Sequence, residues 1–133
     1  MTTNAELRTM IEKLLDKSQL QYFKGIIMRD EFSKLEPPWN TEYGIYNLQT
    51  SGEQGSHWIM WARIDGNWYH ACPYGGDACK ELLEYAGEPV VSSTFQLQEF
   101  GETCCGQICV MLIYLLSEGI DFEEAVLSLV NDE

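Results

Sequence analysis

The sequence predicts an α+β fold, because helical and strand-like patterns occupy different parts of the chain. Apolar residues recur at helical spacing near both ends, whereas the middle is rich in aromatic and β-branched residues broken by turn signals. With 133 residues, 45% hydrophobic and 12% aromatic, the chain can fill one core. We therefore expect residues 1–133 to form a single domain in which helices flank a central, mostly antiparallel sheet.

The first half of the chain is expected to contain one helix and three strands. Thr3-x-x-Glu6 resembles a capping box, and the apolar residues after it predict a helix over about residues 4–17. Pro37-Pro38 marks a connection within this half. The strands are expected at Tyr22–Met28, Tyr43–Leu48 and His57–Ile64.

The second half begins with a hairpin and ends with two helices. Asp65-Gly66 predicts the hairpin turn, and Asp77 is expected to cap a helix that Gly87 ends. The long apolar helix is expected to lie centrally and to stop at Gly119. The remaining expected elements are a strand at Trp68–Cys72, a strand at Val90–Leu97, the apolar helix from Cys105 to about Leu116 and a helix at Phe122–Val130.

Three polar residues near the ends of these elements suggest acyl-transfer chemistry. Cys105 is expected in the first turn of the apolar helix, where free N–H groups and the helix dipole favour a thiolate. His57 opens a strand and would supply the base, while Gln98 and the backbone N–H of Cys105 would stabilise an oxyanion. On residue type alone, a lone histidine before a tryptophan is more often structural, and a buried cysteine is usually an inert small hydrophobic residue.

Composition limits the partners and the location that we expect. The net charge is −13, and residues 37–133 carry only Arg63 and Lys80 against fifteen acids. Such a surface repels phosphate, which argues against nucleic acid as a direct partner. The N-terminus lacks a signal-peptide pattern, and the longest apolar run, Ile108–Leu116, is too short to span a membrane. We therefore expect an intracellular protein that is not secreted and has no membrane contact.

The five cysteines are expected to be reduced. Their number is odd and three of them cluster at residues 104–109, which is unfavourable for a disulfide framework. Cys104 and Cys109 lie on one expected helix, and no second pair has the spacing of zinc ligands. We expect neither a metal nor another cofactor.

Several segments occur in the order and at the distances found in one protease family. They are Tyr22-Phe-Lys-Gly25, Asn47 ten residues before His57-Trp58, Cys72-Pro73-Tyr74-Gly75, and Gln98 seven residues before Cys105-Gly106. In these segments the chain resembles the adenovirus-type cysteine endopeptidases, the adenain-like family. It is similar, more distantly, to the SUMO-deconjugating proteases of the same clan.

The resemblance implies a papain-like-clan core with its nucleophile at a buried helix N-terminus. It assigns Cys105 as nucleophile, His57 as general base and Gln98 as oxyanion-hole donor, and gives Asn47 a supporting structural role. Cys105 is preferred to Cys104 because Gly106 follows it. The implied activity is a viral-type endopeptidase that cleaves capsid or core precursor polypeptides after small or Gly-containing motifs. An isopeptidase that removes a ubiquitin-like modifier and an inactive, protease-derived binding module are the alternatives.

Two departures from the family pattern matter. Cys72 stands where the family has an acid, so the site would be a Cys–His dyad, use Asp65, Asp77 or His70 as a substitute, or be inactive. The family's activating peptide is attached through a cysteine at the position of Gly87, and DNA also activates the family. Neither cofactor carries over, although a small activating peptide stays open as a partner beside the protein or peptide substrate.

Overall fold

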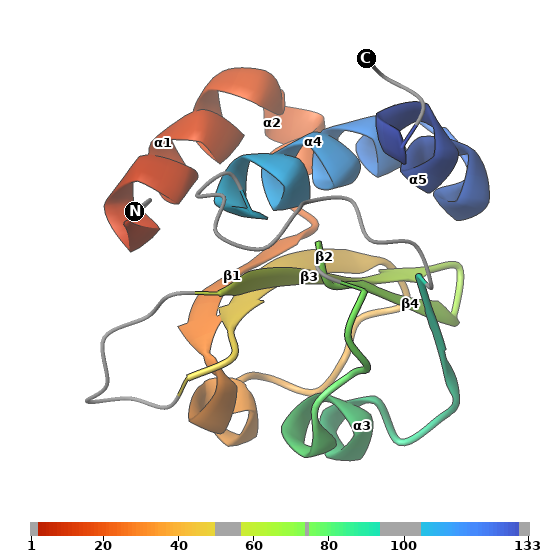
Figure 1. Cartoon of the computed structure of the whole chain (residues 1–133). Coiled ribbons are helices and arrows are strands. Elements are labelled where there is room, and N and C mark those ends of the chain that lie inside the picture. Colours follow the sequence, from red (N-terminus) through yellow and green to blue (C-terminus); the bar gives the residue numbers. More distant parts are fainter. Residues whose placement is uncertain (1–2, 50–56, 74, 94–104, 131–133) are drawn as a thin grey trace.

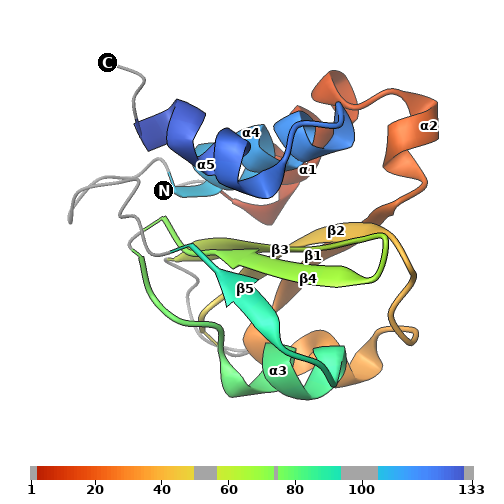
Figure 2. The same cartoon turned by 90° about the vertical axis from the view of Figure 1, so that its right-hand side faces the viewer.

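The structure is a computed structural model that describes residues 3–49, 57–73, 75–93 and 105–130. Its elements are α1 (Asn4–Leu14), α2 (Lys17–Leu20), β1 (Phe23–Met28), the 3₁₀ helix η1 (Arg29–Lys34), β2 (Glu42–Asn47), β3 (Trp58–Ile64), β4 (Asn67–Ala71), α3 (Lys80–Ala86), β5 (Val90–Ser92), α4 (Cys105–Ser117) and α5 (Phe122–Val130). Helices α1, α4 and α5 cover one face of the sheet, and η1 and α3 lie on the other (Figure 1, Figure 2). The predicted α+β class is confirmed.

The five strands lie side by side in sequence order. Strand β3 runs antiparallel to β2 and β4, and these two pairings contain most of the paired residues. The outer pairs, β1 with β2 and β4 with β5, are parallel. Parallel neighbours need a crossover connection, which η1 provides for the first pair and α3 for the second. Both crossovers pass below the same face of the sheet (Figure 1).

The predicted hairpin between β3 and β4 is present at Asp65-Gly66. Both residues have positive φ, 49° and 84°, as the twist of a two-residue hairpin requires. The predicted capping box is also present, since the Thr3 hydroxyl accepts the Glu6 N–H at 3.1 Å and the Glu6 carboxylate accepts the Thr3 N–H at 3.0 Å. Strong local signals therefore fixed these boundaries.

Three predicted boundaries differ from the structure by more than one residue. The first helix stops at Leu14, not about residue 17, because Asp16 accepts the Gln19 N–H and so caps the separate helix α2. Asp77 does not cap α3, since that helix starts three residues later with Cys79 as its N-cap. Strand β5 covers Val90–Ser92, and residues 94–97 of the longer predicted strand lie outside the described residues.

None of the described helices is long and apolar enough to span a membrane.

Both faces of the central strands are buried, so two cores share one sheet. Alternate residues of β3 point to opposite sides, with Trp58 and Met60 in one core and Ile59 and Trp61 in the other. The α4-face core combines the sheet with α1, α4 and α5 through residues that include Leu7, Ile11, Ile45, Met60, Cys109, Leu112 and Ile113. The α3-face core consists of Phe32, Tyr46, Ile59, Trp61, Trp68, Cys72, Leu82 and Ala86.

The buried carboxylate of Glu42 connects several segments of the chain on the α3 face of the sheet. Glu42 on β2 has no exposed surface, and its oxygens accept hydrogen bonds from four donors. These donors are the Lys24 ammonium at 3.1 Å, the Trp39 backbone N–H at 2.8 Å, the Trp61 indole N–H at 2.8 Å and the Tyr85 hydroxyl at 2.8 Å. Because the donors come from β1, the connection before β2, β3 and α3, one side chain fixes four segments relative to β2.

The indole of Trp61 also explains a glycine in the neighbouring strand. Gly44 pairs with Trp61 in the β2–β3 register. A Cβ atom on Gly44 would overlap the Trp61 ring, so no larger residue fits without displacing the indole from Glu42. The glycine therefore provides the space in which the indole reaches the carboxylate.

Replacing Glu42 with Gln is expected to destabilise the fold by about 3–5 kcal/mol, as for other buried ion pairs that lose one partner. The change leaves the Lys24 ammonium, whose side chain is only 3% exposed, without its anion. Urea unfolding followed by tryptophan fluorescence measures the effect. The control is Glu88→Gln, whose carboxylate pairs with Arg63 but is 53% exposed and should contribute at most about 1 kcal/mol. Equal losses in the two variants would contradict a special role for Glu42.

Candidate active site

The residues of interest meet at one end of the sheet, which we call the site end. Strands β1 and β2 finish there with the paired residues Met28 and Asn47. Strand β3 begins there with Trp58, which pairs with Asn47, and β4 finishes nearby at Ala71. The N-terminus of α4 lies above this end (Figure 1). Loops and termini that meet around a rigid sheet end are common positions for functional side chains.

Cys105 lies at the site end in hydrogen-bond contact with β3. It is the first residue of α4 and is 5% exposed. The backbone N–H of Trp58 points to its sulfur, with N and Sγ separated by 3.5 Å. This N–H belongs to the peptide group that joins His57 to Trp58. From standard bond lengths, Sγ is therefore within about 6 Å of the His57 Cα atom, which brings two of the predicted site residues together.

The end of β4 explains why this N–H is available to a thiol. Leu48 donates its N–H to the His57 carbonyl at 3.0 Å, so in the alternating antiparallel pattern the Trp58 N–H points away from β2, towards β4. Continuing the β3–β4 register would place Pro73 opposite Trp58. The chain instead turns there, closed by a 2.7 Å hydrogen bond from the Gly75 N–H to the Cys72 carbonyl. Cys105 thus accepts a hydrogen bond that a longer β4 would have taken.

Gly106 allows the helix to start this close to its neighbours. A Cβ atom at this position would lie 2.6 Å from a methyl carbon of Leu7 on α1 and 3.3 Å from the Trp58 ring. The first turn of α4 is therefore wedged between α1 and β3. This contact is the physical reason for a glycine directly after Cys105.

Cys72 lies beside the same end of the sheet. It is 7% exposed, and the continued register places it opposite Ile59, two residues from His57 on the neighbouring strand. The following segment folds back over it, since a Cβ atom on Gly76 would lie 3.5 Å from its sulfur. A thiol, and no carboxylate, thus occupies the strand position at which the family pattern has an acid.

Two of the three substitutes considered for that acid are wrong. Asp65 lies in the hairpin at the opposite end of β3, roughly 25 Å along the strand from His57. His70 pairs with Trp61 in the middle of the sheet, and its ring is already bound in the α3-face core. Asp77 is exposed in the segment that folds back past Cys72, so it is the one of the three that remains a candidate.

His70 is a structural histidine. It has no exposed surface, its Nε2 lies 3.0 Å from the Tyr46 hydroxyl, and its Nδ1 lies 3.3 Å from the Ser92 hydroxyl. Burial lowers the pKa of His70 to about 4, which keeps the ring neutral at physiological pH. The ring therefore links β2, β4 and β5 by neutral hydrogen bonds.

The four described cysteines, Cys72, Cys79, Cys105 and Cys109, are free thiols. Cys109 lies one turn after Cys105 on α4 and has no exposed surface. Burial raises its pKa well above the ordinary value, with smaller contributions from nearby Cys105 and Cys72. Burial likewise raises the pKa of Cys79. Cys109 and Cys79 are thus held in the thiol form, unsuited to nucleophilic attack.

Asn47, at the site end, has a buried side-chain N–H group without a hydrogen-bond partner among the described residues, which the sequence did not predict. Its side chain is fully buried, and its Oδ1 accepts the Gln49 N–H at 3.0 Å. Its Nδ2 is buried without a hydrogen-bond partner, one of three such atoms in the described part of the chain. An unpaired buried donor costs about 1–3 kcal/mol. The pairing with Trp58 puts this donor on the strand position next to the one that meets Cys105.

Gln98 and Cys104, which the sequence predicts in or beside the site, lie outside the described residues. His57 is half-buried. The structure thus brings Cys105, Cys72 and the backbone of His57 and Trp58 to one end of the sheet. A thiol at a helix start beside a histidine is an arrangement capable of acyl transfer.

Sequence comparison gives no match, since neither a family model nor a curated protein sequence matches the chain. Two crystal structures of the ASFV pS273R protease are similar in fold. One has a TM-score of 0.58 at 12% identity, covering 84% of this chain and 55% of that one. The other, of the Se-Met protein, has a TM-score of 0.50 at 15% identity, covering 74% and 41%.

This chain therefore spans about half the length of the ASFV protease structures that it matches. At these identities the likeness establishes a shared α+β fold and nothing about activity. Membership of the adenain-like family stays a prediction.

The burial of His70 predicts a loss of stability in mild acid. In the unfolded chain the ring gains a proton below about pH 6.5, whereas in the folded chain it does so only near pH 4. Between these values the unfolded state binds more protons, so the free energy of unfolding falls as pH falls, by on the order of 3 kcal/mol. Urea unfolding between pH 7 and pH 4 measures this fall. His70→Gln should remove that part of the slope and His57→Gln should keep it; an unchanged slope in His70→Gln would show that His70 titrates normally.

Proposed function

We propose that this chain is a cysteine protease that hydrolyses peptide bonds through a thiolate and an imidazole. The hydrogen bond between the Trp58 N–H and the Cys105 sulfur carries the proposal, because it holds the thiol beside the peptide that follows His57. The position of Cys105 at the start of α4 adds the helix N–H groups and dipole, which favour negative charge. The shared fold with a protease of known structure supports the same conclusion.

Each residue has a defined role in the proposed reaction. The sulfur of Cys105 attacks the substrate carbonyl carbon, and the protonated imidazole of His57 gives its proton to the leaving amine. A water molecule then loses a proton to His57 and attacks the resulting thioester, which releases the acid and restores the Cys105 thiolate beside the protonated His57. Gln98 and the Cys105 backbone N–H are proposed as donors to the oxyanion that forms in both steps.

The proposed substrates are viral precursor polypeptides of the capsid or core, cleaved after small or Gly-containing motifs. The resemblance to the adenain-like family supports this class, and the fold shared with the ASFV protease supports protease function in general. The position of Cys72 supports one competing function, an inactive binding module, because the site end has a thiol where the family has its orienting carboxylate.

An electrophilic peptide should label Cys105. We expect a peptide that ends in a glycine vinyl sulfone to modify this residue alone, as located by mass spectrometry after digestion. His57→Ala should slow the modification by about 10²–10⁴, the range for loss of a positioned base. Cys79→Ala is the matched control and should label at the wild-type rate, since burial holds Cys79 as a thiol. Modification at Cys104 or Cys72, or a rate that does not depend on His57, would overturn the assignment.

The Cys72 position predicts a gain of function. Cys72→Asp should raise kcat/KM at least tenfold, because an anion that orients the base restores part of the about 10²–10⁴ that general base catalysis provides. Cys72→Ser is the neutral control and should bring no gain.

Three outcomes of this experiment are distinct. A gain in Cys72→Asp supports a Cys105–His57 dyad in the native chain. No gain in Cys72→Asp, with collapse of activity in Asp77→Asn, would assign the role to Asp77. No activity in any variant, with no labelling of Cys105, would support the binding module.

A further inference from the structure

A groove lies between η1 and α3, on the face of the sheet away from α4. Its volume is about 320 Å³. Its lining residues are Asp30, Phe32, Ser33, Leu35, Pro37, Glu81, Glu84 and Tyr85. The proposed hydrolysis uses none of them, so the groove is a separate feature of the surface.

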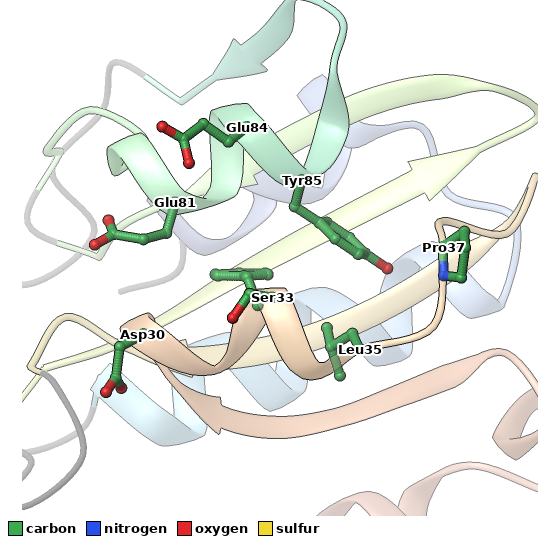
Figure 3. A pocket seen from close by; sticks show the side chains of 8 residues that line it. Asp30, Ser33, Leu35, Pro37, Glu81, Glu84 and Tyr85 are labelled. Atoms are coloured by element: carbon green, nitrogen blue, oxygen red, sulfur yellow. The ribbon is translucent and has the colours of Figure 1, made fainter.

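The groove has an apolar floor and an acidic end. Tyr85 lies across the floor with its hydroxyl towards Pro37, and Leu35 borders the same half (Figure 3). The side chains of Asp30 on η1 and of Glu81 and Glu84 on α3 lie spread along the other half (Figure 3). The lining thus separates an aromatic and aliphatic half from a half with three carboxylates, beside which Arg29 pairs with Glu81 at 3.5 Å and Lys80 lies 3.8 Å from Glu84.

The floor is rigid because other contacts fix Tyr85. Its hydroxyl donates to Glu42 at 2.8 Å, and its ring packs against Phe32 with centroids 5.3 Å apart. The walls are held as well, since Arg29 at the start of η1 pairs with Glu81 on α3 at 3.5 Å. A preformed groove binds a partner without an ordering cost.

The chemistry of the lining favours an arginine side chain. The aliphatic stem and planar head of arginine pack well against an aromatic floor, and its guanidinium pairs with carboxylates in a fork-like geometry. Glu84 is accessible to such a partner, because its pair with Lys80 is long, at 3.8 Å, and both side chains are mostly exposed. The overall charge of −13 would attract a basic partner over longer distances.

Other ligand classes fit the groove less well. Phosphate groups and acidic peptides would be repelled by the carboxylates of Asp30, Glu81 and Glu84. A metal ion needs converging ligands, and the described residues contain no group of three or more His, Cys, Asp or Glu side chains that could hold one. A metal ion would also make no favourable contact with the apolar half of the groove.

We propose that the groove between η1 and α3 is a docking site for an arginine-containing basic segment of a partner protein. The arginine stem lies over Tyr85 and Leu35, and its guanidinium faces Glu81 and Glu84. The acidic end is the one nearer the site end of the sheet, because Asp30 follows two residues after Met28, the last residue of β1. The acidic end of the groove therefore lies towards the end of the sheet that holds Cys105.

Binding is tested with a fluorescein-labelled peptide that contains two arginines in a glycine–serine background. Fluorescence polarisation is measured on Cys105→Ala protein, so no cleavage is needed and the outcome is independent of the proposed protease activity. Replacing arginine with citrulline, which keeps the shape and removes the charge, should weaken binding about tenfold or more. Ser33→Arg, which fills the groove with an internal guanidinium, should also weaken binding about tenfold.

Matched charge variants separate the groove from general attraction. Glu81→Gln with Glu84→Gln should weaken binding by about tenfold. Glu123→Gln with Glu124→Gln removes the same charge from exposed positions on α5 and should have little effect. Thermal melting and circular dichroism establish that each variant is folded.

Two results would overturn the docking site. The first is equal binding of the citrulline peptide, and the second is an equal loss in the α5 variant, which would reduce the effect to net charge.

Discussion

The buried ion pair between Glu42 and Lys24 is the interaction on which the rest of the structure depends. Glu42 accepts four hydrogen bonds, and each donor comes from a different segment of the chain. A buried carboxylate without these donors would be strongly unfavourable, so the segments must assemble together. The same contacts fix the indole of Trp61 and the ring of Tyr85. The α3-face core and the floor of the groove thus share one polar centre.

The two faces of the sheet are stabilised by different interactions. On the α4 face, apolar packing places the start of α4 against β3 with Gly106 at the tightest contact. On the α3 face, the Glu42 and His70 hydrogen bonds fix the strands laterally, from β1 across to β5. A rigid sheet with both faces anchored holds its strand ends in place, which is what a site built from backbone and loop residues needs.

Local signals made most elements predictable, whereas long-range pairing did not follow from the sequence. The Thr3 capping box and the Asp65-Gly66 turn have mechanisms that act over a few residues, and both were predicted. The parallel outer strands were not, because their pairing depends on crossovers that tertiary packing decides. The sequence could name Cys105 and His57 as residue types at suitable positions. It could not show that β4 ends before Trp58, which leaves the Trp58 N–H for the thiol. It also could not show that His70 is buried away from His57 and so cannot replace the acid.

The short β4 has a consequence for how such a site changes over evolutionary time. Cys105 binds a backbone N–H of β3 that pairs with no residue of β4, because β4 ends before it reaches Trp58. The length of β4, and not a particular side chain, makes this N–H available. Side chains around this N–H are free to drift as long as the sheet keeps its register. A fold that is similar at 12% identity, with no family model matching the sequence, is compatible with a site fixed by backbone geometry.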